Sequence, residues 1–311
     1  MAAAPFYADV AEAPGGEACV WLDTSDGVRV RAACWRGGSK GTVLLFPGRT
    51  EYVEKYGPAA GEFARRGYAM ATIDWRGQGI ADRLLDEPAP GHVGRFTDYQ
   101  RDVAALVAFL RAEALPEPWF LVGHSMGGCI GLRALHEGLA VRAVAFSAPM
   151  LGIRMHPALR PVAWALATLG PVVGLGDRLV PSTSPMTYVL EAPFEGNFLT
   201  RDRAMYEFMQ RQLTLHPDLA IGGPTLTWLR EALRESRALA RMPSPALPCL
   251  TMLGRAERIV DIGAIRDRMN RWPGAAFDLV EDAEHELMME GPGIRARFYD
   301  GAAALFDAHR G

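Results

Sequence analysis

Gly123-His124-Ser125-Met126-Gly127-Gly128 is the stretch that decides the fold of this chain. It follows a short apolar run, Trp119–Val122, and precedes a run of helical character, Cys129–Gly138. A strand that turns at once into a helix, with a serine at the corner, is a nucleophile elbow. Glycines two residues before and after the serine remove the side chains that would clash at this strained corner. The alternative is a serine that caps a helix behind a glycine turn. The sequence favours the elbow, with Ser125 raised above a sheet edge.

The composition limits the classes of protein. A chain of 311 residues with 49% hydrophobic content can form one large α/β domain, or one such domain with an insertion. Its net charge of −3 gives no field that would attract nucleic acid or an anionic membrane. The cysteines lie far apart, without metal-ligand spacing, and we interpret them as small buried side chains in a reducing compartment: Cys19, Cys34, Cys129 and Cys249.

No stretch of the chain has the pattern of a signal peptide or of a membrane span. Met1–Val10 lacks both a basic region and a long apolar core, so we expect a cytoplasmic protein. The longest uncharged run lies between Arg160 and Asp177 and has 16 residues, interrupted by prolines and glycines. It is too short to span a bilayer. It indicates a helical hairpin that lines an apolar pocket or touches a membrane surface.

Strands and helices alternate through the first half of the chain. An Asp-Gly turn between Cys19–Leu22 and Val28–Trp35 predicts an antiparallel hairpin, preceded by an irregular lead-in over residues 1–16. Strands and helices then follow one another, which predicts a mostly parallel sheet with helices on both faces. The predicted strands are Thr42–Phe46, Tyr68–Ile73, Trp119–Val122 and Val141–Phe146, and the predicted helices are Tyr56–Arg66, Tyr99–Ala114 and Met126–Gly138.

This alternation stops between about Leu151 and Pro245. That segment contains only helical runs, at Val162–Leu169, Asp202–Leu215 and Leu226–Ala240. The pattern resumes with strands Cys249–Leu253 and Ala276–Val280 and helices Ile262–Asn270 and Ile294–His309. We therefore predict a core formed by residues 1–150 and 246–311, with a helical cap inserted at residues 151–245. An insertion after a strand lies over the sheet edge where sites are built, so it is a candidate lid.

Ser125 needs a base, because a serine hydroxyl alone is a poor nucleophile. Of the seven histidines, His285 follows the strand Ala276–Val280 by a short loop, at the carboxyl edge of the predicted sheet. His124 adjoins the serine, but neighbouring residues on a sharp turn point apart, so we expect it to pack beneath the elbow. His285 is the predicted base.

The acid that orients the base should follow an earlier strand, in the chain order serine, acid, histidine. The loop after Cys249–Leu253 offers Glu257 and Asp261. Glu257 sits in the tight part of the loop, whereas Asp261 suits the cap of the next helix. A glutamate can serve, since the acid only orients and stabilises the imidazolium. We favour Glu257 and keep Asp261 as the alternative.

Two backbone amides should form the oxyanion hole. One belongs to the residue after the nucleophile, Met126, and the other to the loop after the strand Thr42–Phe46. That loop reads Pro47-Gly48-Arg49, which makes the Arg49 amide the second donor. The side chain of Arg49 is either a polar contact in the site or, as we favour, a solvated arginine.

These residues, in this order, resemble the α/β-hydrolase superfamily in its bacterial lysophospholipase and monoacylglycerol lipase branch. The resemblance runs from about Gly41 to the end of the chain. It implies serine hydrolysis of a carboxylic ester under a helical cap, with no cofactor. It rests on the elbow and on the stretches Phe46–Glu51, Lys55-Tyr56, Gly67-Tyr68, Ile73–Gly79, Gly91–Val93, Phe96–Tyr99, Asn197–Thr200, His216–Thr225 and Ala283–Glu286.

The chain departs from the family at two positions. The family commonly has His-Gly in the oxyanion loop, where this chain has Pro47-Gly48, and its acid is more often an aspartate, where this chain has Glu257. Asp74 and Asp98 also match family positions, and we interpret both as structural residues that tie loops near strand ends.

The leading hypothesis is an esterase for a single-acyl lipid, either a lysophospholipid or a monoacylglycerol. The alternatives are a carboxylesterase for small or aryl esters and a non-catalytic ligand-binding protein of the same fold. The apolar residues of the insertion would form either ordinary core or an acyl-chain pocket. We expect no nucleic-acid partner, a transient membrane contact through the cap, and a cytoplasmic location at the inner membrane surface. A phosphate anchor is not evident; Arg201, Arg203 and Arg211 are unsupported possibilities.

Overall fold

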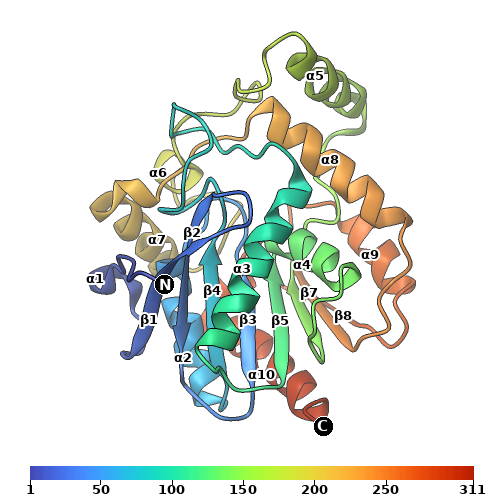
Figure 1. Ribbon diagram of the computed structural model, residues 1–311. Coiled ribbons are helices and arrows are strands. Elements are labelled where there is room, and N and C mark those ends of the chain that lie inside the picture. Colours follow the sequence, from blue (N-terminus) through green and yellow to red (C-terminus); the bar gives the residue numbers. More distant parts are fainter.

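The computed structural model describes residues 1–311 and builds them around one sheet of eight strands (Figure 1). The strand order is β1-β2-β4-β3-β5-β6-β7-β8. All eight strands were predicted from the sequence, and their bounds are β1 Glu17–Asp23, β2 Arg29–Trp35, β3 Thr42–Phe46, β4 Ala69–Asp74, β5 Trp119–His124, β6 Val144–Ser147, β7 Cys249–Gly254 and β8 Ala276–Val280.

The first two strands form the predicted hairpin. β1 and β2 pair antiparallel, with Asp23 opposite Arg29, and β2 pairs antiparallel with β4. The other neighbouring strands are parallel, from β4-β3 through to β7-β8. The carboxyl ends of the parallel strands therefore meet at one edge of the sheet, where a site can form.

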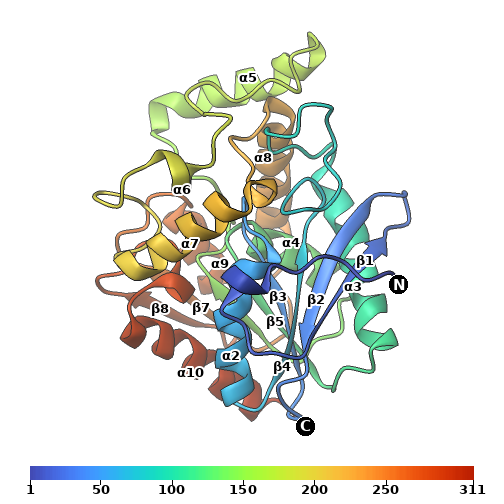
Figure 2. The ribbon, with the colours of Figure 1, turned by 90° about the vertical axis from the view of Figure 1, so that its left-hand side faces the viewer.

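Helices cover both faces of the sheet, as the alternation predicts (Figures 1 and 2). Side chains alternate along β3: Leu44 and Phe46 belong to one hydrophobic cluster, Val43 and Leu45 to the other. The first cluster is completed by α3 (Tyr99–Ala112), α4 (Met126–His136) and α9 (Ile262–Asn270), the second by α2 (Gly57–Arg65) and α10 (Pro292–Ala308). Strands buried on both faces explain the continuous apolar runs in the sequence.

The segment 151–245 is helical and lies at the end of the molecule to which the parallel strands point (Figure 2). It contains α5 (Arg160–Val172), α6 (Tyr188–Glu191), α7 (Arg203–Leu215) and α8 (Leu226–Arg241), so the three predicted runs are present and α6 was missed. The side chains of Asp202 and Thr225 cap α7 and α8. None of the helices has the length and apolar character needed to cross a membrane.

The helix predicted at Tyr56–Arg66 is present as α2, and a 3-10 turn, Val53–Tyr56, precedes it. Two other predictions were partly wrong. The strand predicted at Val141–Phe146 begins only at Val144, because the chain is still leaving α4 through a glycine turn. The lead-in, predicted as irregular, contains the short helix α1 (Ala8–Ala11), and Ala3 pairs with Val20 of β1.

A buried ion cluster ties the end of β4 to the loop after β3. The guanidinium of Arg31 contacts Glu54 at 2.6 Å and Asp74 at 2.8 Å, and all three side chains are fully buried. Asp74 also accepts hydrogen bonds from the amides of Val53 (2.8 Å) and Ile80 (3.0 Å). Asp74 therefore ties two loops, as we expected. Asp98 does not: its one ion pair, with Arg101, spans 3.7 Å at the surface.

We expect Arg31→Met to lower the free energy of unfolding by about 3–5 kcal/mol, because it leaves two buried carboxylates without their counter-charge. Arg36→Met, which removes a half-exposed pair with Glu113, is the matched control and should cost at most about 1 kcal/mol. Urea unfolding followed by circular dichroism measures both. Equal losses in the two variants would contradict the structural role of the cluster.

Candidate active site

Ser125 stands at the corner between β5 and α4, as the elbow requires. Its backbone has φ 48° and ψ −118°, a conformation that non-glycine residues rarely adopt. Gly127 is needed because a Cβ there would lie 2.0 Å from the carbonyl oxygen of Phe46, at the end of β3. The first turn of α4 therefore packs directly against the loop that follows β3.

Side chains clamp that loop and leave one of its amides unengaged. The Gly48 amide donates to the carboxylate of Glu51, and the Thr50 amide donates to the Gln78 side chain. The clamp is completed by hydrogen bonds from Trp75 to the Pro47 carbonyl and from Gln78 to the Gly48 carbonyl, each 3.0 Å long. The amides of Arg49 and Met126 have no acceptor within the protein. Met126 opens α4, where free amides and the helix dipole favour negative charge.

His285 lies in the loop after β8 and contacts Glu257, which lies in the loop after β7. The Nδ1 atom of His285 is 2.7 Å from Oε2 of Glu257, and both side chains are buried. The other carboxylate oxygen of Glu257 accepts the amides of Ile259 (2.5 Å) and Val260 (3.0 Å). When Nδ1 of His285 carries the proton and donates a hydrogen bond to Glu257, Nε2 is unprotonated and free to accept a proton.

His285 and Glu257 each stabilise the charged form of the other. Burial alone would lower the pKa of His285, but the charge and hydrogen bond of Glu257 outweigh it and raise that pKa above its usual value. Burial would raise the pKa of Glu257, but His285 and two backbone amides hold it below its usual value. The carboxylate is therefore ionised at neutral pH and can stabilise an imidazolium.

Asp261, the alternative acid, lies at the start of α9. Its Oδ1 accepts the amide of Ala264 at 3.2 Å, which is a helix cap, and its Oδ2 contacts Arg160 at 3.1 Å. The structure thus brings Glu257 to the imidazole and gives Asp261 the capping contact that its position in the sequence suggested.

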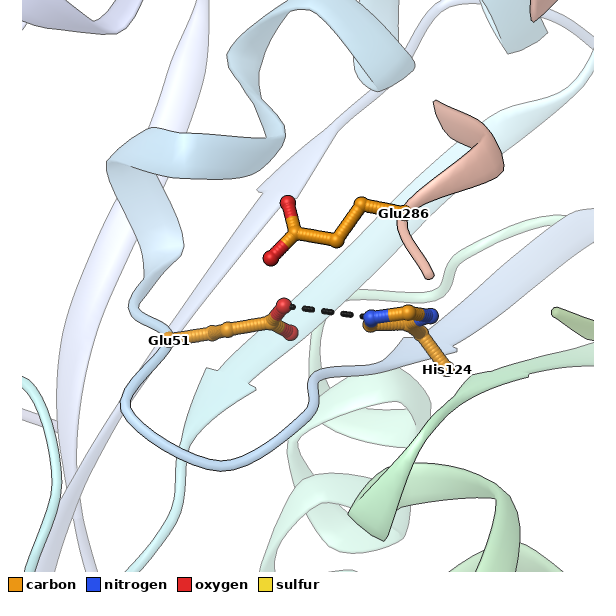
Figure 3. Close-up of side chains that lie close together, drawn as sticks. All are labelled: Glu51, His124 and Glu286. Atoms are coloured by element: carbon orange, nitrogen blue, oxygen red, sulfur yellow. Dashed lines mark ion pairs between the residues drawn. The ribbon is translucent and has the colours of Figure 1, made fainter. Parts of the chain in front are cut away.

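A second buried cluster lies beside the elbow: Glu51, His124 and Glu286 (Figure 3). Their potential ligand atoms lie within 4.8 Å of one another, a spacing that could suit a metal ion. However, the ammonium of Lys55 bridges the carboxylates, at 2.9 Å from Glu51 and 2.7 Å from Glu286. The cationic position between the two acids is thus filled by the protein itself, and the cluster fits an internal ion network better than a metal site.

The network also fixes the charge of its members. Burial lowers the pKa of His124 to about 4, so this histidine is neutral near pH 7. Burial would raise the pKa of Glu51, but Lys55 and His124 lower it to about 2. His124 is buried behind the serine, with Nδ1 3.1 Å from the Ser147 carbonyl, as we expected. Sequence reasoning assigned no role to Lys55 or Glu286, although both lie in stretches that carry the resemblance.

A cavity of about 750 Å³ connects these residues with the cap. Ser125, His285 and Arg49 line it, and 17 of its 33 lining residues are hydrophobic. Some apolar residues of the segment 151–245 line the cavity, such as Met186 and Phe198, and others, such as Met205 and Phe208, are buried in the core. Met209 and Trp228 do both. The segment thus contributes to the core and to the cavity, and the acyl-chain pocket stays a prediction.

The fold is that of an α/β-hydrolase. It has the eight-stranded sheet in this order, a serine at the corner between a strand and a helix, and a helical insertion over the strand ends. Residues 37–292 match the family described as serine aminopeptidase, S33. The chain belongs to this family.

The relatives and the solved structures agree with this class. The chain is 34% identical over 289 residues to lysophospholipase L2 of Escherichia coli (strain K12), covering 86% of this chain and 80% of that protein. It is 28% identical over 255 residues to probable lysophospholipase L2 of Haemophilus influenzae, covering 81% and 79%. A soluble variant of monoglyceride lipase from Saccharomyces cerevisiae superimposes with a TM-score of 0.74 at 19% identity, over 99% of this chain and 100% of that one. A carboxyl esterase from Bacillus coagulans gives 0.75 at 14%, over 96% and 100%.

The raised pKa of His285 predicts the pH dependence of hydrolysis. The imidazole must be neutral to accept a proton, so kcat/KM should rise with pH through a midpoint above the usual histidine value of about 6.5. Glu257→Gln removes the charge that raises this pKa, so the midpoint should move to lower pH. The variant should also lose on the order of 10²–10⁴ in kcat, because the imidazolium loses its partner.

The matched control is Asp261→Asn, which alters the cap of α9 and the surface contact with Arg160 and should keep both the midpoint and kcat. A pH–rate profile on a chromogenic ester measures both quantities. An unshifted midpoint in Glu257→Gln, or a collapse of kcat in Asp261→Asn, would reject Glu257 as the acid.

Proposed function

We propose that this protein hydrolyses the ester bond of a single-acyl lipid, a lysophospholipid or a monoacylglycerol, through an acyl-enzyme on Ser125. As a class it is a carboxylic ester hydrolase. The observation that carries the proposal is the cavity: it joins Ser125 and His285 to an apolar space roofed by the segment 151–245. Such a space can hold an acyl chain while the ester carbonyl faces the serine.

The reaction proceeds in two halves. Ser125 attacks the ester carbonyl while Nε2 of His285 takes its proton, and the negative charge that forms on the carbonyl oxygen is held by the amides of Arg49 and Met126. His285 then gives the proton to the leaving alcohol, which departs and leaves the acyl group on Ser125. A water molecule, deprotonated by His285, attacks this ester, and the fatty acid leaves as the proton returns to Ser125. Glu257 orients His285 throughout.

The competing functions make different demands on the cavity. An aminopeptidase, the activity in the family's description, must bind a protonated α-amine beside the scissile bond. The buried carboxylates of Glu51 and Glu286 are already bound to Lys55, so they are not free for that task. A carboxylesterase for small or aryl esters would not need an apolar roof of this size. A silent binding protein would not need the contact between His285 and Glu257.

A fluorophosphonate probe should add one adduct to the protein, because it reacts with an activated serine. Intact mass spectrometry should show this adduct lost in Ser125→Ala and kept in Ser184→Ala, which changes another serine of the same cavity. The protein should then cleave long-chain monoacyl esters faster than acetyl or aryl esters. Folded protein without an adduct would reject the hydrolase, and a preference for the short esters would favour the carboxylesterase.

We further propose that the cap contacts a membrane surface from the cytoplasmic side, at the inner membrane. α5 and its two flanking residues carry an apolar stripe of side chains that are 42–68% exposed, at three- and four-residue spacing: Leu159, Val162, Leu166, Leu169 and Val173. Ala163 of the same helix lines the cavity, so the stripe lies next to the space proposed for the acyl chain. A lipid surface fits this stripe, because it would cover the stripe and deliver the substrate at the same place.

The double variant Leu166→Asp/Leu169→Asp should lose binding to vesicles, since it places two charges on the inserted face. Co-sedimentation with vesicles of phosphatidylcholine and phosphatidylglycerol measures binding, and a water-soluble chromogenic ester checks that the site still works. Leu215→Asp is the matched control, because Leu215 is 57% exposed at the end of α7. Unchanged binding in the double variant, or equal loss in the control, would reject the stripe as the contact.

A further inference from the structure

Arg49 is the one cation of the cavity without an opposing carboxylate. Arginine and lysine occur there only as Arg49 and Lys55. Lys55 is neutralised by two carboxylates, whereas Arg49 forms no ion pair. This overturns our expectation of a solvated side chain: Nε of Arg49 is completely shielded and has no hydrogen-bond partner. Burial lowers the pKa of Arg49 to about 10, so the group still carries its charge at neutral pH.

The surroundings hold the guanidinium in one position. Its Nη2 donates to the carbonyl of Gly222, and the group lies over the ring of Trp228, 5.3 Å from the centroid. It also packs against the backbone of Gly91, where an added Cβ would lie 2.9 Å from Nη2. Nη1 makes no hydrogen bond and, unlike Nε, is not completely shielded, so it can donate to a group bound in the cavity that Arg49 lines.

A desolvated cation without a counter-charge is costly, so proteins rarely keep one unless an anion completes it. The first amides of α8, beside Trp228, are not alternatives, because they already donate to carbonyls and to Thr225. The remaining carboxylate of the cavity, Glu191, is exposed to water. The arginines considered from the sequence, Arg201, Arg203 and Arg211, each pair with acidic residues at the surface.

We propose that the side chain of Arg49 binds the phosphodiester of a lysophospholipid head group, while the amide of the same residue serves the oxyanion. The assignment rests on the proposed esterase function and narrows its substrate to a single-acyl glycerophospholipid rather than a neutral monoacylglycerol. Phosphate oxygens accept the charge-assisted hydrogen bonds of a guanidinium particularly well, and Nη1 of Arg49 has no other acceptor. A neutral glycerol head group would leave the charge of Arg49 unpaired.

The first test compares two substrates with the same acyl chain, a lysophosphatidylcholine and a monoacylglycerol. Arg49→Gln keeps the backbone amide but not the charge, so kcat/KM should fall at least about tenfold more for the lysophospholipid than for the monoacylglycerol, mainly through KM. Arg49→Lys should lie between, because it keeps the positive charge but not the planar group that Gly222 and Trp228 hold in place. Arg203→Gln, an exposed arginine outside the cavity, is the matched control and should match the wild type on both substrates.

The second test separates this assignment from the esterase function itself. Glycerol 3-phosphate should inhibit hydrolysis of a neutral aryl ester competitively in the wild type, and at least about tenfold more weakly in Arg49→Gln. Equal losses on both lipids in Arg49→Gln, or equal inhibition of the two proteins, would overturn the phosphate contact while leaving the esterase intact. A wild type that cleaves monoacylglycerol but not the lysophospholipid would overturn it too. A wild type that cleaves no ester would instead reject the proposed function.

Discussion

The contact between the first turn of α4 and the end of β3 is the constraint on which the site depends. Gly127 has no Cβ, and only for that reason can its backbone lie against the carbonyl oxygens of Phe46 and Pro47. This contact brings the serine at the start of one element and the loop after another to the same corner of the sheet. The two amides that we propose for the oxyanion, those of Arg49 and Met126, are backbone groups of this corner, so they need no side-chain ordering when charge develops on a substrate.

Around that corner, the buried charges are arranged so that one histidine can titrate. Lys55 cancels part of the negative charge of Glu51 and Glu286, and burial keeps His124 neutral. The carboxylate that contacts His285 directly is Glu257, which is held by two amides as well. The pKa of His285 therefore depends chiefly on one partner at 2.7 Å, and the more distant acids add to it in the same direction. This arrangement suits the roles that we propose, with His285 as the base and Glu257 as the acid that orients it.

The sequence predicted those features that depend on local spacing. The glycines of the elbow, the strand–helix alternation and the capping position of Asp261 can all be recognised within a few residues, and the structure agrees with each of them. The sequence could not predict contacts between residues that only the fold brings together. The contact between Lys55 and Glu286 joins residues that are 231 positions apart. Likewise, no residue near Arg49 in the sequence indicates that its guanidinium lies over the ring of Trp228 and has no carboxylate partner. The start of β6 differed from the prediction because the glycine turn at Gly138 delays the strand, and apolar periodicity alone does not reveal such a turn.

Two features of the cavity and of the segment above it depart from the pattern in which apolar groups are covered and charges are paired. The stripe on α5 is apolar and exposed, and Arg49 is charged and unpaired. Such departures are expected at functional sites, because selection for stability alone would have removed an exposed apolar stripe or an unpaired buried charge. A single-acyl phospholipid would satisfy both: the membrane in which it resides covers the stripe, and its phosphate pairs with the guanidinium. A neutral lipid would satisfy only the first. The charge of one side chain therefore narrows a substrate class that the apolar cavity alone leaves broad.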